Sequence, residues 1–272
     1  MKSLSTIIDE LPSTWLVFGN GLSIQPHYQE LLIRTTLVNS MNINIGYQYF
    51  PHSTMTLFRD YNVWESYKDD LVKLPLLVTC DDVDKKHLNY PNMQKIKVSY
   101  ETLVNHDNLL TGYPIFYGNV TGTMALHLAC CLTKPKIFLR GSLDINSKPN
   151  YKFNYRESNI YLFGFDYGAG DVVKGKKLTH FFQDQGVDYM GFGKTKTYTK
   201  TYADRYFDKF KNIGCNIYNV VDTPISQIDS FPKISYAEFF QQHLPKIELP
   251  KISQPELQTN IHQLLNHYKA LK

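Results

Sequence analysis

The sequence predicts an α/β protein, with a mostly parallel sheet flanked by helices and a helical appendage at the C-terminus. Over the first two-thirds of the chain, short apolar runs alternate with helical patterns, as expected when helices connect the strands of a parallel sheet. The first run, at residues 15–18, is continuously apolar and ends at Gly19, which is typical of a buried strand. Further strands are expected at 36–38, 55–58, 76–79, 137–139, 160–163 and 217–220.

Helices are expected between and after these strands. Residues 124–132 are apolar nearly all round, which suits a helix buried against the sheet. Residues 198–213 carry Tyr202, Tyr206, Phe210 and Ile213 on one helical face, and Gly214 follows as a C-cap. A short helix near 235–243 and a longer one near 254–271 fit the C-terminal part.

Changes of pattern divide the chain into two regions. We expect residues 1–222 to form one α/β domain. Residues 140–158 are rich in polar and turn residues and indicate an insertion or an exposed hairpin. From 223 to 272 prolines punctuate the sequence, which favours a C-terminal helical extension without a core of its own.

The composition excludes several classes of protein. The chain has 272 residues, of which 43% are hydrophobic and 14% aromatic, so it is neither disordered, collagen-like nor a coiled coil. None of its four cysteines lies in a CxxC pair, which argues against zinc and redox motifs and for free thiols in a reducing compartment. We find no secretory signal and no apolar run of about 18 residues. We therefore expect no transmembrane segment and a cytoplasmic protein, or one peripheral to a membrane.

The first candidate for binding is the loop from Gly19 to Ser23, which has the sequence GNGLS and follows the first strand. Glycines allow a sharp turn there, and the N–H groups of a following helix can bind phosphate. Ile24 stands where a dinucleotide fingerprint needs its third glycine. The loop is thus either a ligand site or only a tight strand-to-helix turn.

Two further segments carry candidate residues. The segment NVTGT places Thr121 at the start of the apolar helix, where its hydroxyl caps the helix and can also bind a ligand phosphate. Asp166 and Tyr167 directly follow the strand at 160–163, and ligands of open α/β sheets bind beyond such carboxyl ends. By contrast, His127 within the apolar helix is better explained as a hydrogen-bonded core residue than as a metal ligand.

Together, the three segments GNGLS, NVTGTMALHLACCL and IYLFGFDYG resemble a group of Rossmann-like enzymes over roughly residues 14–221. The group includes bacterial lipooligosaccharide sialyltransferases, flagellin-modifying motility accessory factor glycosyltransferases and the archaeal 6-hydroxymethyl-dihydropterin diphosphokinase. The order and spacing of the segments carry the resemblance. It implies a glycosyltransferase that moves a sugar from a nucleotide-sugar, such as a CMP-sugar, to an acceptor hydroxyl without an obligatory metal.

The resemblance also implies which residues bind the donor. The nucleotide-contacting loop corresponds to Gly19, Asn20, Gly21 and Ser23, with Leu22 in place of the family's proline. The segment DYMGFGK resembles another sialyltransferase motif, and this chain keeps the tyrosine and the first glycine of that motif as Tyr189 and Gly191. Asn39 lies at the expected end of the second strand. The other donor-binding residues that the family resemblance implies are Asn39, Thr121, Asp166, Tyr167 and Tyr189.

One departure from the family concerns the catalytic base. The family's histidine falls at Phe192, which cannot accept a proton, although a base near the attacking hydroxyl accelerates such transfers. We expect His180 or Asp188 to supply the base, His180 being favoured by its ordinary pKa. Otherwise the protein performs different chemistry.

Charge is concentrated in one segment. Residues 174–211 hold nine Lys and Arg against four Asp and Glu, a net charge of +5 compared with +4 for the whole chain. Such a segment is a solvated basic face or attracts an anion such as the donor, an acidic glycan acceptor or a nucleic acid.

Two other functions stay open at this level. One is a pyrophosphoryl transferase that requires Mg²⁺, with Asp60, Asp81 and Asp82 as ligands. The other is a non-catalytic glycan- or nucleic-acid-binding protein that kept the fold and lost the base at Phe192.

Overall fold

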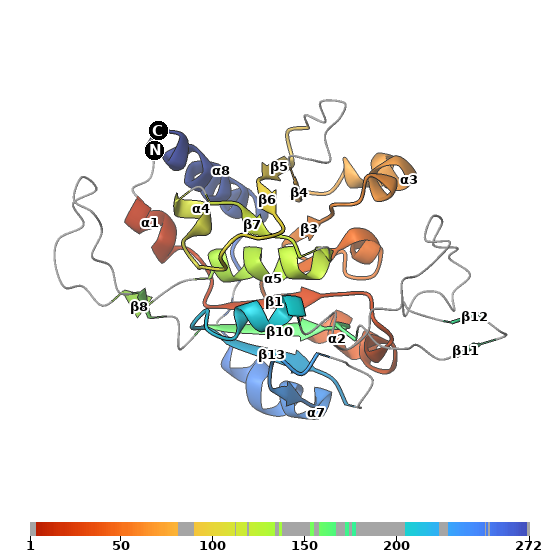
Figure 1. Cartoon of the computed structure of the whole chain (residues 1–272). Coiled ribbons are helices and arrows are strands. Elements are labelled where there is room, and N and C mark those ends of the chain that lie inside the picture. Colours follow the sequence, from red (N-terminus) through yellow and green to blue (C-terminus); the bar gives the residue numbers. More distant parts are fainter. Residues whose placement is uncertain are drawn as a thin grey trace.

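A computed structural model provides the structure of the chain (Figure 1). It describes residues 4–80, 90–111, 113–118, 120–133, 136–137, 153–154, 158–166, 172–173, 176–177, 205–222, 228–247, 249 and 251–270. Every structural statement below concerns these residues.

Eight parallel strands form the central sheet, in the order β14-β13-β10-β1-β2-β3-β4-β5. This is an α/β, Rossmann-like architecture, as the sequence predicts. The strands are β1 (Thr14–Phe18), β2 (Ser40–Ile43), β3 (Met55–Leu57), β4 (Leu77–Cys80), β5 (Met93–Ile96), β10 (Asn159–Phe163), β13 (Asn216–Val220) and β14 (Lys233–Ile234).

Short ladders surround the central sheet. β6 (Val98–Ser99) pairs in parallel with β7 (Ile115–Phe116), and β11 (Val172–Val173) pairs antiparallel with β12 (Lys176–Lys177). β8 (Lys136–Ile137) and β9 (Phe153–Asn154) also pair antiparallel. The run expected at 137–139 thus belongs in its described part to a separate ladder and not to the central sheet.

The helices cover both faces of the sheet (Figure 1). α5 (Thr121–Cys131) packs on β1, β2 and β10, and all eleven of its residues are buried. The described helices also include α1 (Leu4–Asp9), α2 (Tyr28–Arg34), α3 (Tyr61–Leu71), α4 (Asn108–Thr111), α7 (Tyr236–Glu238) and α8 (Gln254–Ala270), together with the shorter turns η1 (Leu22–His27), η2 (Asn44–Gln48), η5 (Asp208–Phe210), η6 (Phe239–His243) and η7 (Leu244–Lys246).

Aromatic side chains build the core on the face opposite α5. Phe18 stacks on Phe50 at 4.1 Å between ring centroids and lies 5.3 Å from Phe163. Phe163 in turn meets Phe239 of η6 edge-on at 4.9 Å. Because side chains alternate between the faces of a strand, these rings share one face while the indole of Trp15 bonds Leu132 at the end of α5 on the other. Much of the high aromatic content is therefore core.

The second strand is the main misplaced element. The sequence predicts a strand at 36–38, but Thr35 to Val38 form the turn after α2, and β2 begins at Ser40. Leu37, which makes that run look apolar, is 56% exposed. In β2 itself, Ser40 and Asn42 interrupt the apolar pattern although both are buried. A buried strand with polar residues gives no continuous apolar run, and the prediction was wrong for that reason.

The C-terminal part contributes more than helices. The expected helices near 235–243 and 254–271 correspond to α7 with η6 and to α8. In addition, β14 adds a parallel edge strand to the sheet. Leu257, Ile261 and Leu264 of α8 belong to the same buried cluster as the strands.

Candidate active site at the carboxyl edge of the sheet

The order of the strands creates a switch point between β1 and β10. From β1 the chain adds β2, β3, β4 and β5 on one side, and it later returns to place β10, β13 and β14 on the other. The loops after β1 and β10 therefore leave the sheet next to each other, at the edge formed by the carboxyl ends of the strands. Open α/β sheets bind their ligands at such points.

Backbone hydrogen bonds join these two loops. The N–H of Gly19 donates to Phe163 O at 2.7 Å, and that of Gly21 donates to Gly164 O at 2.9 Å. A Cβ at Gly19 would lie 2.6 Å from Gly164 O, and Gly164 itself has φ +67°. The glycines are thus required for close packing of the loops, which accounts for the GNG sequence without a ligand.

Ser23 and Asp166 bind each other. The Asp166 carboxylate accepts the Ser23 N–H at 2.8 Å and the Ser23 hydroxyl at 2.6 Å. Burial raises the pKa of Asp166, and the two bonds from Ser23 oppose that rise. Since this carboxylate holds the N–H group that opens η1, it occupies the position where a phosphate would bind a helix N-terminus.

Three asparagine oxygens lie buried at the adjoining ends of β1 and β2. The Oδ1 atoms of Asn20, Asn42 and Asn44 accept no hydrogen bond within the described part of the chain. Two of these residues lie beside Gly46, where a Cβ would be 3.1 Å from Asn42 Cβ and 3.5 Å from Asn20 Oδ1. Asn44 directly follows β2 in the chain. Buried amide oxygens normally have a donor, so this group is suited to a ligand that supplies N–H or O–H groups.

Asn44 is the residue that sequence reasoning missed in this group. It follows β2 directly, is partly exposed and has φ +55°. An asparagine tolerates this left-handed conformation better than most residues. The sequence signal for a site residue is a polar side chain just after the end of a strand. Because the second strand was expected at 36–38, this signal pointed to Asn39 instead of Asn44.

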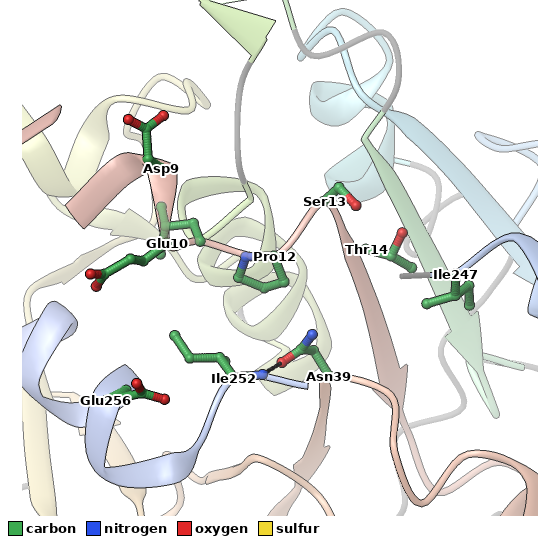
Figure 2. Close-up of a pocket in the computed structure, with 10 residues that line it drawn as sticks. Asp9, Glu10, Pro12, Ser13, Thr14, Asn39, Ile247, Ile252 and Glu256 are labelled. Atoms are coloured by element: carbon green, nitrogen blue, oxygen red, sulfur yellow. Dashed lines mark hydrogen bonds between the residues drawn. The ribbon is translucent and has the colours of Figure 1, made fainter. Parts of the chain in front are cut away.

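Asn39 lies at the opposite edge of the sheet, and its expected place beside the nucleotide loop was wrong. Because β2 begins at Ser40, Asn39 precedes the strand at its amino end. Its Oδ1 accepts the Ile252 N–H at 3.0 Å (Figure 2). It lines a separate pocket of about 290 Å³ together with, among others, Glu10, Thr14 and Glu256.

Thr121 begins α5 and lies at the carboxyl edge. The indole N–H of Trp15, near the amino end of β1, donates to Leu132 O at 3.0 Å, just after the last turn of α5. α5 therefore runs antiparallel to β1, and its N-terminus points to the same edge as the GNGLS loop. The expected cap is wrong: Val120 is the N-cap, without a side-chain bond, and the Thr123 hydroxyl donates back to Val120 O at 2.8 Å.

The histidine of α5 is a core residue, as the sequence predicts. His127 Nδ1 accepts the Phe116 N–H at 2.7 Å, and its Nε2 lies 2.9 Å from Asn105 O. Burial lowers the pKa of His127 to about 4. Both nitrogens are thus satisfied by backbone groups.

A histidine–aspartate pair stands beside the Ser23–Asp166 pair. His27 Nε2 lies 2.5 Å from Asp222 Oδ2, and the other oxygen of Asp222 accepts the Tyr236 N–H at 2.8 Å. The His27 ring stacks on Tyr236 at 3.9 Å and 14°. Burial raises the pKa of Tyr236, the Asp166 carboxylate adds to this, Ser23 opposes it, and Asp222 adds further.

Sequence reasoning missed this pair. His27 ends η1 after β1, and Asp222 follows β13 by two residues, so both belong to the carboxyl edge. In its neutral form a histidine whose Nε2–H points at a carboxylate presents the lone pair of Nδ1. Both side chains are partly exposed, at 25% and 36%, and such a pair can accept a proton from a bound hydroxyl.

Several expected site residues lie outside the described residues. They include the expected bases and the remaining strand-end and basic positions: Tyr167, His180, Asp188, Tyr189, Phe192, Asp81, Asp82 and most of 174–211. Of the expected carboxylates for Mg²⁺, the structure describes Asp60, whose pKa is raised by burial. Among the residues described, no group of three or more His, Cys, Asp or Glu could hold a metal ion.

Comparisons with known proteins gave one solved structure. No family model matches the chain. No curated protein matches it either. The chain is similar to the MAf glycosyltransferase from Magnetospirillum magneticum AMB-1, at 10% identity and a TM-score of 0.48. That similarity covers 95% of this chain and 38% of the solved one, so the chain spans well under half of that protein's length.

The structure also bears on membrane insertion. Within its described part, none of the helices has both the length and the apolar character needed to cross a bilayer.

Proposed function

We propose that the protein is a glycosyltransferase that uses a nucleotide-sugar donor, a CMP-sugar or a related compound. The observation that carries the proposal is the meeting of the resembling segments at one edge. The GNGLS loop after β1, the Asp166 segment after β10 and the N-terminus of α5 all lie at the carboxyl ends of the strands around the switch point. An open α/β sheet binds nucleotides there.

The proposed binding mode assigns the nucleoside to the β1–β2 side of this edge. Asn20, Asn42 and Asn44 supply three unsatisfied acceptors there, and a base and a ribose carry N–H and O–H donors. The donor phosphate is expected near Thr121, because the positive end of the α5 dipole faces this edge. The N–H of Ser23 is less suited to it, since Asp166 already holds that group.

The acceptor is expected on the β13 side. From β2 across β1 and β10 to β13 are three strand spacings, roughly 14 Å, along which an extended donor can lie. There His27, oriented by Asp222, would take the proton of the attacking hydroxyl, while the bond between sugar and phosphate breaks and the phosphate leaves with the electron pair. This assignment would compensate for the absence of a histidine at position 192. His180 and Asp188 remain the bases predicted from the sequence.

Binding is tested by calorimetric titration with CMP, UDP, ATP and their sugars, with and without Mg²⁺. We expect a CMP or UDP compound to bind without Mg²⁺. Asn44→Gly preserves the positive φ and removes the amide, and it should weaken binding about tenfold, as the loss of a single hydrogen bond does. Asn39→Ala is the matched control at the opposite edge and should leave the affinity unchanged. If no nucleotide binds, the proposal fails.

Other results would select the alternatives. ATP binding that requires Mg²⁺ would favour the pyrophosphoryl transferase. Steeply salt-dependent binding of a polyanion with no donor turnover would favour a non-catalytic binding protein.

The base is tested by donor turnover. His27→Gln should lower kcat by about 10²–10⁴-fold, as the loss of a general base does, with little change in donor affinity. Asp222→Asn should also lower kcat, because the amide has one acceptor oxygen for the two donors, the Tyr236 N–H and His27 Nε2. An NH2 group facing Nε2 would favour the tautomer in which Nδ1 carries the proton and cannot act as the base. Unchanged kcat in both variants would assign the base elsewhere, with His180 and Asp188 as the next residues to replace.

A further inference from the structure

Two thiols far apart in sequence meet at the amino edge of the sheet. Cys130 lies in the last turn of α5, and Cys215 directly precedes β13. Their Sγ atoms are 3.9 Å apart, although the residues are separated by 85 positions. This is a non-bonded contact, and a disulfide would need the sulfurs to approach to about 2.05 Å. No CxxC motif reveals the pair, because the contact arises only from the fold.

The two thiols differ in accessibility. Cys130 is completely buried, whereas Cys215 is partly exposed. Cys215 follows Gly214, which has φ +98° and where an added Cβ would meet no atom within 4 Å. Cys215 is therefore the more accessible residue of the two, although burial also acts on its thiol.

The surroundings also favour a thiolate at Cys215. The hydrogen bond from the Cys130 thiol lowers the pKa of Cys215, burial opposes this, and His106 lowers the pKa further. The ring of His106 is held by its Nδ1, 2.8 Å from Cys130 O. Burial raises the pKa of Cys130, so within the pair the proton belongs to Cys130.

The other two cysteines lack this combination. Cys80 is buried in β4. Cys131 is also buried, its Sγ lies 3.5 Å from Asn105 O, and burial raises its pKa to about 12. Since the thiolate is the reactive form, neither competes with Cys215.

We propose that Cys215 is a site of reversible modification by low-molecular-weight disulfides and that Cys130 is its resolving thiol. The Cys215 thiolate attacks one sulfur of the small disulfide, forms a mixed disulfide and releases a thiolate. Cys130, after losing its proton, attacks Cys215 Sγ and expels the second small thiol. The pair is thereby oxidised by two electrons to a Cys130–Cys215 disulfide, and the small disulfide is reduced to two thiols.

This site is independent of the proposed function. The pair lies at the amino edge, whereas the candidate active site lies at the carboxyl edge. A Cys130–Cys215 bridge would tie the end of α5 to the turn before β13 and restrict the unfolded chain. We expect oxidation to raise Tm by about 5–10 °C and to leave nucleotide affinity unchanged.

The test treats the full chain, under native conditions, with oxidised glutathione at neutral pH. After quenching in acid and alkylation under denaturing conditions, intact mass should show two blocked thiols and two alkylated ones. Peptide mapping should find Cys130 joined to Cys215, and dithiothreitol should reverse the change. A bridge between other cysteines, or four alkylated thiols after treatment, would overturn the proposal without requiring any variant to fold.

Variants separate the roles of the two thiols. Cys130→Ser should stop the reaction at a single glutathionyl adduct on Cys215, and Cys215→Ser should abolish modification. Cys131→Ser is the matched control beside Cys130 and should form the bridge as the unaltered chain does. Equal modification of the Cys215→Ser variant would contradict the role of Cys215.

Discussion

At the scale of single residues, Asp166 acts as a hydrogen-bond acceptor, and this role does not need a negative charge. Its carboxylate accepts two hydrogen bonds from Ser23, yet burial raises its pKa. Because the folded state favours the neutral form, the contribution of this group to stability is present below its ordinary pKa of 3.8. That contribution is lost as pH rises through the raised pKa.

Two replacements of Asp166 should distinguish the effect of its buried charge on stability from the effect of its hydrogen bonds. At pH 7, Asp166→Asn should be at least as stable as the unaltered chain, because the amide oxygen still accepts a bond and no charge is buried. Asp166→Ala leaves Ser23 without its acceptor and should lower the free energy of unfolding by about 1–3 kcal/mol. Urea denaturation from pH 4 to 8 measures both. An Asn variant less stable than the Ala variant would contradict this account.

Single residues also show where sequence reasoning ends. The sequence predicted that the GNGLS loop and Asp166 follow strand ends. The hydrogen bonds between them form because β10 pairs with β1, and no local sequence pattern predicts that pairing. Asn39 was misassigned because a strand that starts one residue later moves an asparagine to the other edge of the sheet. His27 and Asp222 meet only because β13 lies two strands from β1.

At the scale of elements, α5 was predicted well, because its burial is encoded locally. A helix that is apolar on all sides is expected to be buried. His127 is the polar exception within it, and both ring nitrogens meet backbone groups. Its two bonds connect α5 to β7 and to the segment before α4.

Acid should therefore loosen the packing of α5. Burial lowers the pKa of His127 from 6.5 to about 4, so its contribution to stability is present above pH 6.5 and is lost as pH falls toward 4. The loss is expected to approach about 3 kcal/mol at the acid end. Urea denaturation of the unaltered chain between pH 7 and pH 4 measures it.

The histidines of other elements provide the comparison. Burial, and then Lys251, lower the pKa of His52 to about 4, but this side chain is less buried and should contribute less. His127→Gln should flatten the pH dependence of stability more than His52→Gln does. Equal slopes in the unaltered chain and the His127→Gln variant would show that His127 titrates normally.

At the scale of the whole molecule, the alternation of runs predicted the class of fold but not the order of its strands. β5 and β14 were missed, since β5 carries Gln94 and Lys95 at its centre and β14 has two residues. Such strands form because they pair with a neighbouring strand, and their own sequence shows no hydrophobic pattern that would predict them. The same long-range pairing sets the switch point between β1 and β10. The residues at the edge proposed to bind the donor could therefore be predicted from the sequence only in part.

One buried cluster extends from Ile7 near the start of the chain to Leu264 in α8. α8 contacts α1, α4 and β5, and the Asn260 amide donates to Glu10 at 3.2 Å. We therefore expect α8 to unfold together with the sheet. Ile261→Ala should lower the free energy of unfolding by about 2–4 kcal/mol, as the loss of a buried side chain in a packed core does.

The measurement compares two probes of unfolding in urea. Tryptophan fluorescence reports on Trp15 in β1 and Trp64 in α3, and far-ultraviolet circular dichroism reports on all helices, α8 included. The two transitions should coincide in the Ile261→Ala variant, both shifted to lower urea. Thr259→Ala, on the exposed side of α8, should change stability by less than about 0.5 kcal/mol. A helix that shares one core with the sheet cannot unfold while the central strand stays buried. A loss of dichroism that precedes the change in fluorescence would therefore contradict this prediction and indicate that α8 unfolds separately.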